Sequence, residues 1–230
     1  MNDGTNRRIL VVGATSKIAE HFIRSCPPSY EIYGTNGNNK SKLLATEHRF
    51  IVDLAQIAQI NTFLNEVSGI TFDAVLFFAA TYGHDPENSD DYFEAYQKDL
   101  QLNAASIVAI AKGVTLADNS KLFVFGDAGL THPKKGFTSY SISKFAVADI
   151  ARILAVELAP QTSTFCLRLG PTLKEDASPD GSYYRRSLLR VNSPVDGLVN
   201  LLQFLIAERN FNATGCVIDY DGGAYIKRLS

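Results

Sequence analysis

The sequence lacks a long apolar run and a marked excess of either charge, and each absence excludes a class of protein. No apolar run reaches the ~18 residues that a membrane-spanning helix needs, so we expect no such span. The N-terminal residues MNDGTNRR contain no apolar segment, so we expect no secretory signal. The formal net charge is only −2, which favours neither a nucleic-acid-binding groove nor attachment to an anionic membrane.

Cysteine and histidine are scarce, and their spacing is informative. The three cysteines are far apart, odd in number and in or near apolar runs: Cys26, Cys166 and Cys216. This arrangement is typical of reduced packing residues in a cytoplasmic protein, and not of a disulfide framework. The four histidines are dispersed and match no metal-ligand spacing, so we expect no metal site.

Short apolar runs alternate with longer amphipathic segments along the whole chain. The apolar runs predict strands at 8–12, 31–35, 50–52, 74–78, 121–125, 164–169 and 216–220. The amphipathic segments predict helices at 18–25, 57–67, 92–112, 140–158 and 195–207. Continuous apolar runs indicate strands covered on both faces, and the alternation indicates parallel pairing with right-handed crossovers.

These features predict an α/β protein with a single domain over residues 1–230. We expect a doubly wound parallel sheet of Rossmann type, with about seven strands and helices on both faces. A length of 230 residues and a mass of 25.2 kDa suit one such domain with a large core.

A turn of mostly small residues follows the first predicted strand and precedes the first predicted helix. It reads Gly13, Ala14, Thr15, Ser16, Lys17, Ile18, Ala19. Such a turn lets backbone N–H groups and a helix N-terminus approach a pyrophosphate. We therefore predict a dinucleotide site that includes Gly13, Thr15, Ser16, Lys17 and Ile18. Taken alone, the turn is equally compatible with an ordinary connection between a strand and a helix.

The end of the second predicted strand bears on the choice of cofactor. A site specific for NAD usually has an acid there to hold the ribose 2′-hydroxyl, but this strand ends at Thr35 and Asn36. This neutral strand end at Asn36, together with the Lys17 ammonium, favours binding of the 2′-phosphate of NADP. The alternative is that Lys17 is an ordinary solvated charge and that NAD binds.

Tyr140 and Lys144 lie four residues apart, so a helix would put them on one face. A tyrosine hydroxyl, with a reference pKa of ~10, is a weak acid near neutral pH. A neighbouring ammonium lowers that pKa and makes the tyrosine a usable general acid or base. The alternative interpretation is a solvated helix turn.

With these motifs on the same chain, the sequence resembles the short-chain dehydrogenases/reductases over essentially its whole length. The other matching positions are Asp53, Asn103, Thr214-Gly215 and Asp221-Gly222-Gly223. The resemblance implies that Tyr140 donates the proton and that Lys144 binds the nicotinamide ribose and lowers the tyrosine pKa. It also implies that Asn103 holds a water in a proton relay and that Asp53 lies near the adenine. The alternatives are an ordinary helix-face amide for Asn103 and a helix N-cap for Asp53.

The same resemblance implies further contacts. Additional cofactor contacts are expected from Leu54, Ala79, Ala80, Pro171 and Thr172. Residues of about 171–192 correspond to a substrate lid, in which Tyr183 is a candidate substrate contact or the start of an exposed helix. The helices at 92–112 and 140–158 have apolar residues on more than one face, which suggests a homo-oligomer, either a dimer or the tetramer common in the family.

Asp127 departs from the family pattern, because a serine is usual thirteen residues before the tyrosine. A second departure is Phe77-Phe78-Ala79-Ala80, where Asn-Asn-Ala-Gly is usual. An aspartate at this position resembles the pteridine, dihydromonapterin and dihydrofolate reductases of the family. These enzymes also carry an aromatic residue that stacks on the pterin, at the place of Tyr82. A carboxyl group in a partly apolar pocket can donate a proton, so Asp127 and Tyr82 are expected to contact substrate along with Tyr140.

The sequence therefore predicts an NADPH-dependent oxidoreductase that transfers hydride to a C=O or C=N bond of a small substrate. A dihydropterin or dihydrofolate, a simple carbonyl or imine compound, and a sugar or acyl chain all remain open as the substrate. The alternative is a non-catalytic dinucleotide-binding redox sensor or assembly module, which the altered turn and the missing serine would suit. A sensor would not need Asn103, Tyr140 and Lys144 together.

Overall fold

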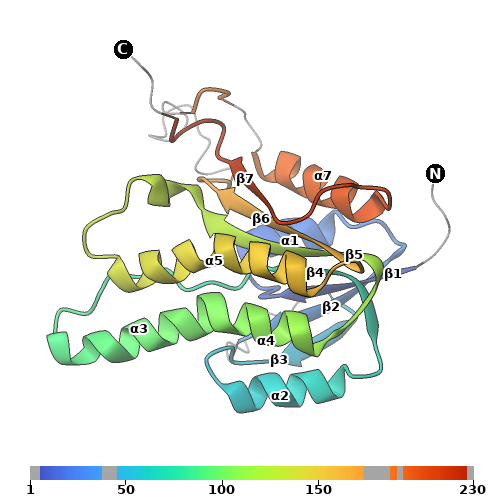
Figure 1. The fold of residues 1–230 in the computed structure, drawn as a ribbon, viewed down its shortest axis with the longest axis horizontal. Helices are drawn as coiled ribbons and strands as arrows, with labels where there is room; N and C mark the ends of the chain where they lie inside the picture. Colours follow the sequence, from blue (N-terminus) through green and yellow to red (C-terminus); the bar gives the residue numbers. More distant parts are fainter. Residues whose placement is uncertain (1–5, 38–45, 174–186, 191–193, 227–230) are drawn as a thin grey trace.

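The structure is a computed structural model that describes residues 6–37, 46–173, 187–190 and 194–226. Within these residues, seven strands form one parallel sheet in the order β3-β2-β1-β4-β5-β6-β7 (Figure 1). The strands are β1 (Arg7–Val12), β2 (Tyr30–Asn36), β3 (His48–Ile51), β4 (Thr71–Phe77), β5 (Thr115–Asp127), β6 (Thr162–Leu169) and β7 (Cys216–Tyr220). The prediction of a doubly wound parallel sheet is confirmed, although β5 begins six residues before the predicted position 121.

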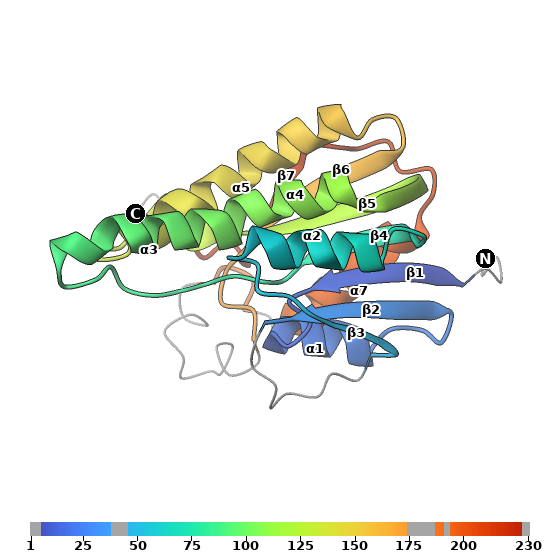
Figure 2. The ribbon, with the colours of Figure 1, turned by 90° about the horizontal axis from the view of Figure 1, so that it is seen from below.

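Helices cover both faces of the sheet. They are α1 (Lys17–Arg24), α2 (Ile57–Glu66), α3 (Tyr92–Leu100), α4 (Ser106–Gly113), α5 (Thr138–Glu157) and α7 (Pro194–Ala207). Figures 1 and 2 show α2, α4 and α5 on one face and α1 and α7 on the other. Among the described residues, no helix combines the length and the apolarity needed to cross a membrane.

The strands are continuously apolar because alternate side chains enter two separate cores. Leu10 and Val12 of β1 belong to the core beneath α2, α4 and α5, whereas Ile9 and Val11 belong to the core beneath α1 and α7. Side chains of a strand point alternately to opposite faces, so both faces must be apolar when both are covered. The three cysteines are free, as expected, and Cys166 is fully buried in the first core.

The predicted helix 92–112 is interrupted, which the periodicity did not indicate. A π-helical turn, Gln101–Ala105, separates α3 from α4, and Asn103 lies within it. A π-turn adds one residue to the helix and is frequent at functional sites. Here it accompanies an asparagine side chain that is buried to 1% exposure and hydrogen-bonded to two other segments.

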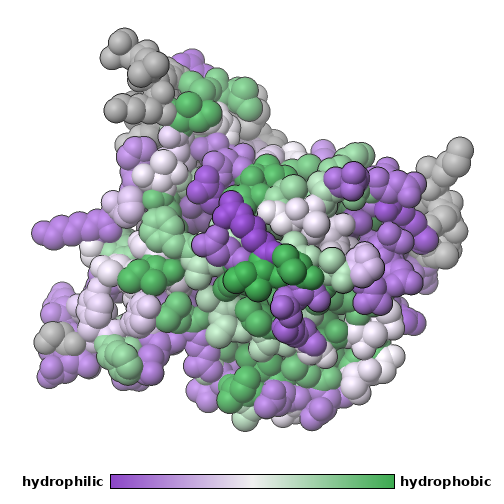
Figure 3. Space-filling model, in the orientation of Figure 1, coloured by the Kyte–Doolittle hydropathy of each residue, from purple (hydrophilic) through white to green (hydrophobic). Residues whose placement is uncertain are grey.

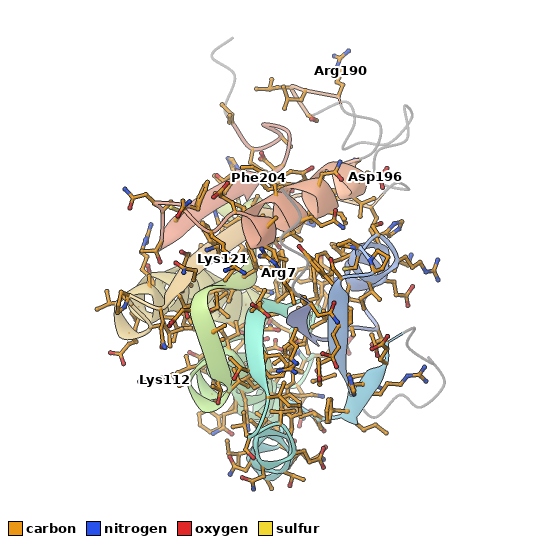
Figure 4. The ribbon with its side chains drawn as sticks, turned by 90° about the vertical axis from the view of Figure 1, so that its right-hand side faces the viewer. Arg7, Lys112, Lys121, Arg190, Asp196 and Phe204 are labelled. Atoms are coloured by element: carbon orange, nitrogen blue, oxygen red, sulfur yellow. The ribbon has the colours of Figure 1, made fainter. Side chains whose placement is uncertain are left out.

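The amino ends of the strands are stabilised by cations (Figure 4). The guanidinium of Arg7 donates to the carbonyl oxygens of Ile206 and Ala207, in the last turn of α7, where carbonyl groups have no partner within the helix. Lys121 is buried nearby, and its Nζ donates to the Asn119 carbonyl at 3.0 Å. Burial lowers the pKa of Lys121, and the Arg7 cation lowers it further. The polar contacts at this end of the sheet therefore join its strands to α7 and to the neighbouring backbone.

At the opposite end of β1, Gly13 is required by the close approach of two segments. Its φ is +80°, and a Cβ atom there would lie 2.5 Å from the backbone nitrogen of Ala79. The Gly13 N–H donates to Thr35 Oγ1 at 3.2 Å, and the Ala79 N–H donates to the Val12 carbonyl at 3.0 Å. The turn after β1 is thus held between the ends of β2 and β4.

Substitution of this glycine tests the packing of the turn. We expect Gly13→Ala to lower the free energy of unfolding by about 2–4 kcal/mol, because alanine must adopt a left-handed conformation and displace the Ala79 backbone. The control is Gly69→Ala, where an added Cβ would meet nothing within 4 Å. Urea denaturation of the three proteins measures the difference. Equal stability of the two variants would contradict the proposed close approach.

Candidate active site

Two adjoining hollows lie at the carboxyl ends of the strands. The first is bordered by eight of the predicted cofactor-binding residues: Gly13, Thr15, Ser16, Asn36, Asp53, Leu54, Ala79 and Ala80. The second is bordered by Ile18, Lys144 and Pro171 from the predicted cofactor set, and by Tyr82, Asp127 and Tyr140 from the predicted substrate set. Ser16, Phe78 and Ala80 border both hollows, so one ligand can extend from the first into the second.

Several predicted residues are not brought into these hollows. Lys17 is exposed at the first position of α1, and Thr172 is buried with its hydroxyl donating to the Gly170 carbonyl at 2.7 Å. Neither residue is among the described residues that border the two hollows. Tyr183 lies outside the described residues, as does most of the expected lid. A cofactor contact from Lys17 or Thr172 therefore stays a prediction.

The first turn of α1 is well suited to an anion. Ser16 is the N-cap of α1, and its Oγ accepts a hydrogen bond from the Ala19 N–H at 3.1 Å. The N–H groups at the start of a helix lack partners within the helix and favour a negative charge nearby. Asp53, by contrast, is not the N-cap of α2, which is Gln56; its Oδ1 accepts from the Ala55 N–H at 3.0 Å.

Asp127 and Tyr140 form a direct hydrogen bond. The Tyr140 hydroxyl donates to Asp127 Oδ2 at 2.7 Å, while Asp127 Oδ1 accepts from the Gly129 N–H at 2.6 Å. Asp127 also caps the short 3₁₀ turn Ala128–Thr131, which accounts for its fixed orientation at the end of β5. The acid that replaces serine therefore contacts the tyrosine oxygen itself.

The expected lowering of the tyrosine pKa is wrong for this structure. Burial raises the pKa of Tyr140, and the negative charge and hydrogen bond of Asp127 raise it further. Lys144 Nζ donates to the Phe125 carbonyl on β5 at 2.9 Å, and burial lowers its own pKa to about 8. The sequence argument considered the lysine alone, whereas a carboxylate next to the phenol favours the protonated phenol.

Asn103 joins the loop after β4 to α5. Its Oδ1 accepts from the Thr81 N–H at 2.9 Å, and its Nδ2 donates to Thr81 Oγ1 at 3.1 Å and to Ser143 Oγ at 2.9 Å. The Ser143 hydroxyl in turn donates to the Tyr140 carbonyl at 2.7 Å. Asn103 is therefore a buried residue and not a solvated amide on the helix face. Its side chain positions the segment that carries Tyr140, and the water relay stays a prediction.

Two acids that sequence analysis missed position the same helix. Asp99 accepts from Thr81 Oγ1 at 2.6 Å and from Ser139 Oγ at 2.7 Å. Asp85 accepts from the N–H groups of Thr138 and Ser139 at 2.9 and 3.2 Å, which caps α5 from a distant loop. The N-cap residue Phe137 has no side-chain acceptor, so an external carboxylate takes this role. Only long-range contacts identify these residues.

The aromatic residues near the site take two different positions. Phe78, where an asparagine is usual, stacks on Phe125 with ring centroids 4.4 Å apart and rings inclined by 14°. Packing between rings thus supports the end of β4. Tyr82, with 63% of its surface exposed, stacks on Phe137 at 5.1 Å and meets the Tyr140 ring edge-on at 4.9 Å. Its position beside Tyr140 in the second hollow agrees with the expected substrate contact, which stays a prediction.

One cluster of potential metal ligands lies away from the hollows. Glu31, Glu47 and His48 have ligand atoms within 4.8 Å of one another. The Glu31 carboxylate already accepts from Tyr33 at 2.9 Å and pairs with Arg8 at 3.2 Å. These contacts satisfy the carboxylate without an ion, so the cluster carries no metal assignment.

Comparison with known proteins gives matches in structure. No protein-family model and no curated protein matches the sequence. A short-chain dehydrogenase family protein from Francisella tularensis is 19% identical, with a TM-score of 0.78 over 95% of this chain and 98% of that chain. A short-chain dehydrogenase from Burkholderia cenocepacia, solved in complex with NADP, is 18% identical, with a TM-score of 0.79 over 96% and 98%.

Aldohexose dehydrogenase from Thermoplasma acidophilum, solved without ligand, is 14% identical and has a TM-score of 0.80 over 100% of this chain and 98% of that chain. The pteridine reductase branch does not appear among these structures and stays a prediction. From β1 to β7, the chain has the fold of the short-chain dehydrogenases/reductases.

Proposed function

We propose that the protein is an NADP-dependent short-chain dehydrogenase/reductase that reduces a C=O or C=N bond of a small substrate. The proposal rests on one observation. Tyr140, Asp127 and Lys144 border the same hollow, and that hollow adjoins the one bordered by the Gly13 turn. The NADP complex of the Burkholderia protein, which has the same fold, supports the choice of cofactor.

The residues present fit a dinucleotide phosphate. Gly13 allows the backbone after β1 to pass within van der Waals reach of Ala79, and Ser16 places the N-terminus of α1 at the junction of the two hollows. The end of β2 offers Thr35 and Asn36 rather than an acid. Bound here, NADPH would supply the hydride, while the protein supplies orientation and a proton.

Proton delivery falls to Tyr140 and Asp127. A tyrosinate beside a carboxylate is disfavoured, as the raised pKa of Tyr140 indicates. Tyr140 donates its hydroxyl proton to the substrate oxygen or nitrogen, and a solvent proton replaces it on the phenol oxygen through Asp127, whose Oδ2 is hydrogen-bonded to that oxygen. One proton is delivered, and the hydrogen-bonded pair returns to its starting state.

The cofactor preference is directly measurable. We expect NADPH to bind more tightly than NADH, because Asn36 is neutral and Lys17 adds a positive charge on the first turn of α1. Lys17→Ala should narrow the ratio of the two dissociation constants by roughly fivefold or more, the scale of one charge-assisted contact. Titration of nicotinamide fluorescence measures both constants, with Lys112→Ala on α4 as the control. Equal affinity of the parent for NADPH and NADH would remove this part of the proposal.

The proton donors are tested by substitution. Tyr140→Phe should lower kcat by ~10²–10⁴, the usual contribution of general acid catalysis, and leave the NADPH dissociation constant unchanged. The matched control is Tyr30→Phe, because Tyr30 begins β2 at the end of the sheet that is away from the hollows. Asp127→Asn should also lower kcat, because an amide cannot relay a proton to the phenol oxygen, and it should lower the pKa of Lys144, because the Asp127 charge raises that pKa. If Tyr140→Phe and Tyr30→Phe gave the same kcat, the assignment would be wrong.

The finer substrate proposal, a dihydropterin or dihydrofolate, rests on Asp127 and on the exposed ring of Tyr82. A panel of dihydropterins, dihydrofolate and simple ketones separates it from a general carbonyl reductase. If the substrate is a dihydropterin or dihydrofolate, the Asp127→Ser variant should lose activity on dihydropterins and keep its activity on ketones. A protein that binds NADPH and turns over no member of the panel would favour the non-catalytic dinucleotide-binding module.

The proposal includes a homo-oligomer. Large apolar side chains are exposed along α3, α4 and α5: Phe93, Val108, Ile142, Phe145, Ile153 and Val156. Figure 3 shows apolar surface among hydrophilic residues on the side of the molecule where these helices lie. An exposed apolar patch of this kind is typical of a protein–protein contact.

Sedimentation at micromolar concentration should therefore give a dimer or a tetramer. Ile153→Glu should shift the protein toward the monomer, because a carboxylate would be buried unpaired in the contact. Ile57→Glu, on α2, serves as the control, since Ile57 is similarly exposed but lies outside the patch. A monomeric parent would contradict this part of the proposal.

A further inference from the structure

A small chamber adjoins the second hollow beyond the Asp127–Tyr140 pair. Its other walls come from the 3₁₀ turn, the start of α5 and the C-terminal segment: Gly129, Leu130, Phe137, Ser141 and Tyr225. Neither Lys144 nor any residue of the Gly13 turn borders it. The chamber is therefore on the substrate side of the proton donors.

Among the residues that the structure describes, one cation borders both spaces. Lys134 borders the chamber and the second hollow, as do Tyr82, Asp127, Tyr140 and Tyr225. These five side chains surround the junction between the two spaces. A substrate that reaches the Tyr140 hydroxyl through this junction must pass close to the Lys134 ammonium.

Among the described residues, the Lys134 ammonium forms no ion pair, although Asp127 borders the same chamber. Asp127 accepts hydrogen bonds from the Tyr140 hydroxyl and the Gly129 N–H instead. The Lys134 Nζ lies 5.9 Å from the centroid of the Phe137 ring. A cation over an aromatic face keeps its capacity to bind an anion.

Aromatic rings connect Lys134 to the catalytic tyrosine. Lys134 lies over Phe137, Phe137 stacks on Tyr82 with 29° between the rings, and Tyr82 meets Tyr140 edge-on. Tyr82 remains 63% exposed, so its ring is accessible to a flat group that enters the junction. The rings of Phe137 and Tyr82 thus lie between the Lys134 ammonium and the proton donor, Tyr140.

We infer that the substrate is a flat, conjugated carbonyl or imine compound that carries an anionic group, a carboxylate or a phosphate, bound by Lys134. The inference rests on the proposed function and names the substrate class of the same site. Lys135, next in the chain, is also exposed but borders neither space, so it provides a matched control.

The test compares NADPH-dependent reduction of 4-formylbenzoate, 4-formylphenyl phosphate and the neutral methyl 4-formylbenzoate. The parent should prefer an anionic aldehyde by at least about fivefold in kcat/KM, mainly through KM, since a fixed charge contributes to binding more than to turnover. Lys134→Gln should abolish the preference, Lys134→Glu should reverse it, and Lys135→Gln should preserve it. The two anionic aldehydes decide between carboxylate and phosphate.

A binding measurement separates the failure of this inference from the failure of the proposed function. Calorimetric titration with benzoate and benzamide needs no turnover, and benzoate should bind the parent more tightly than Lys134→Gln. Absence of turnover with a Lys134-dependent benzoate affinity would remove the oxidoreductase proposal and keep the anion site. An unchanged acid-to-ester ratio in Lys134→Gln, or an equal loss in Lys135→Gln, would overturn the inference.

Discussion

Every neighbouring pair of strands in the sheet is parallel, so each connection must cross a face of the sheet before the chain enters the next strand. All the carboxyl ends then lie along one edge, where the chain leaves the sheet after each strand. Gly13 follows β1, Phe78 follows β4 and Ala128 follows β5, and each marks the beginning of a segment that borders the hollows. The opposite edge is occupied by contacts such as Arg7 with the end of α7. The location of the site follows from the direction of pairing.

Within that edge, the chemistry depends on the balance of charge around one phenol. A lysine alone would favour the tyrosinate, but Asp127 is hydrogen-bonded to the hydroxyl and favours the protonated phenol. Lys144 is itself buried, and its ammonium is stabilised by the Phe125 carbonyl. The site therefore resembles a proton-donating pair with a nearby cation more than a lysine-activated tyrosine. A serine in place of Asp127 would carry no charge and would leave the lysine dominant.

Sequence analysis predicts the fold well because burial on both sheet faces makes each strand continuously apolar. Neighbouring residues such as Ile9 and Leu10 enter opposite cores, so the run is visible in the local sequence. It also predicts that Tyr140 and Lys144 lie on one helix, where both border the second hollow, since helical spacing is a local property. The π-turn at Asn103, the capping of α5 by Asp85 and the position of Lys134 were not predictable in this way. Each depends on residues far away in the chain: Thr81 and Ser143 for Asn103, the start of α5 for Asp85, and Tyr82 and Tyr225 for Lys134. No local pattern identifies such partners. The expected sign of the Tyr140 pKa shift was wrong because the argument considered Lys144 without Asp127.

The hydrogen bonds that Asn103, Asp99 and Asp85 make to the loop after β4 and the first turn of α5 all lie within the chain. Tyr140 is the third residue of α5, so its position is set by these contacts and by the folding of the helix itself. The loss of conformational entropy needed to orient the phenol is therefore incurred on folding, before any ligand arrives. Under the proposed function, binding energy from the cofactor and the substrate is not needed to orient the Tyr140 hydroxyl, which is preorganised.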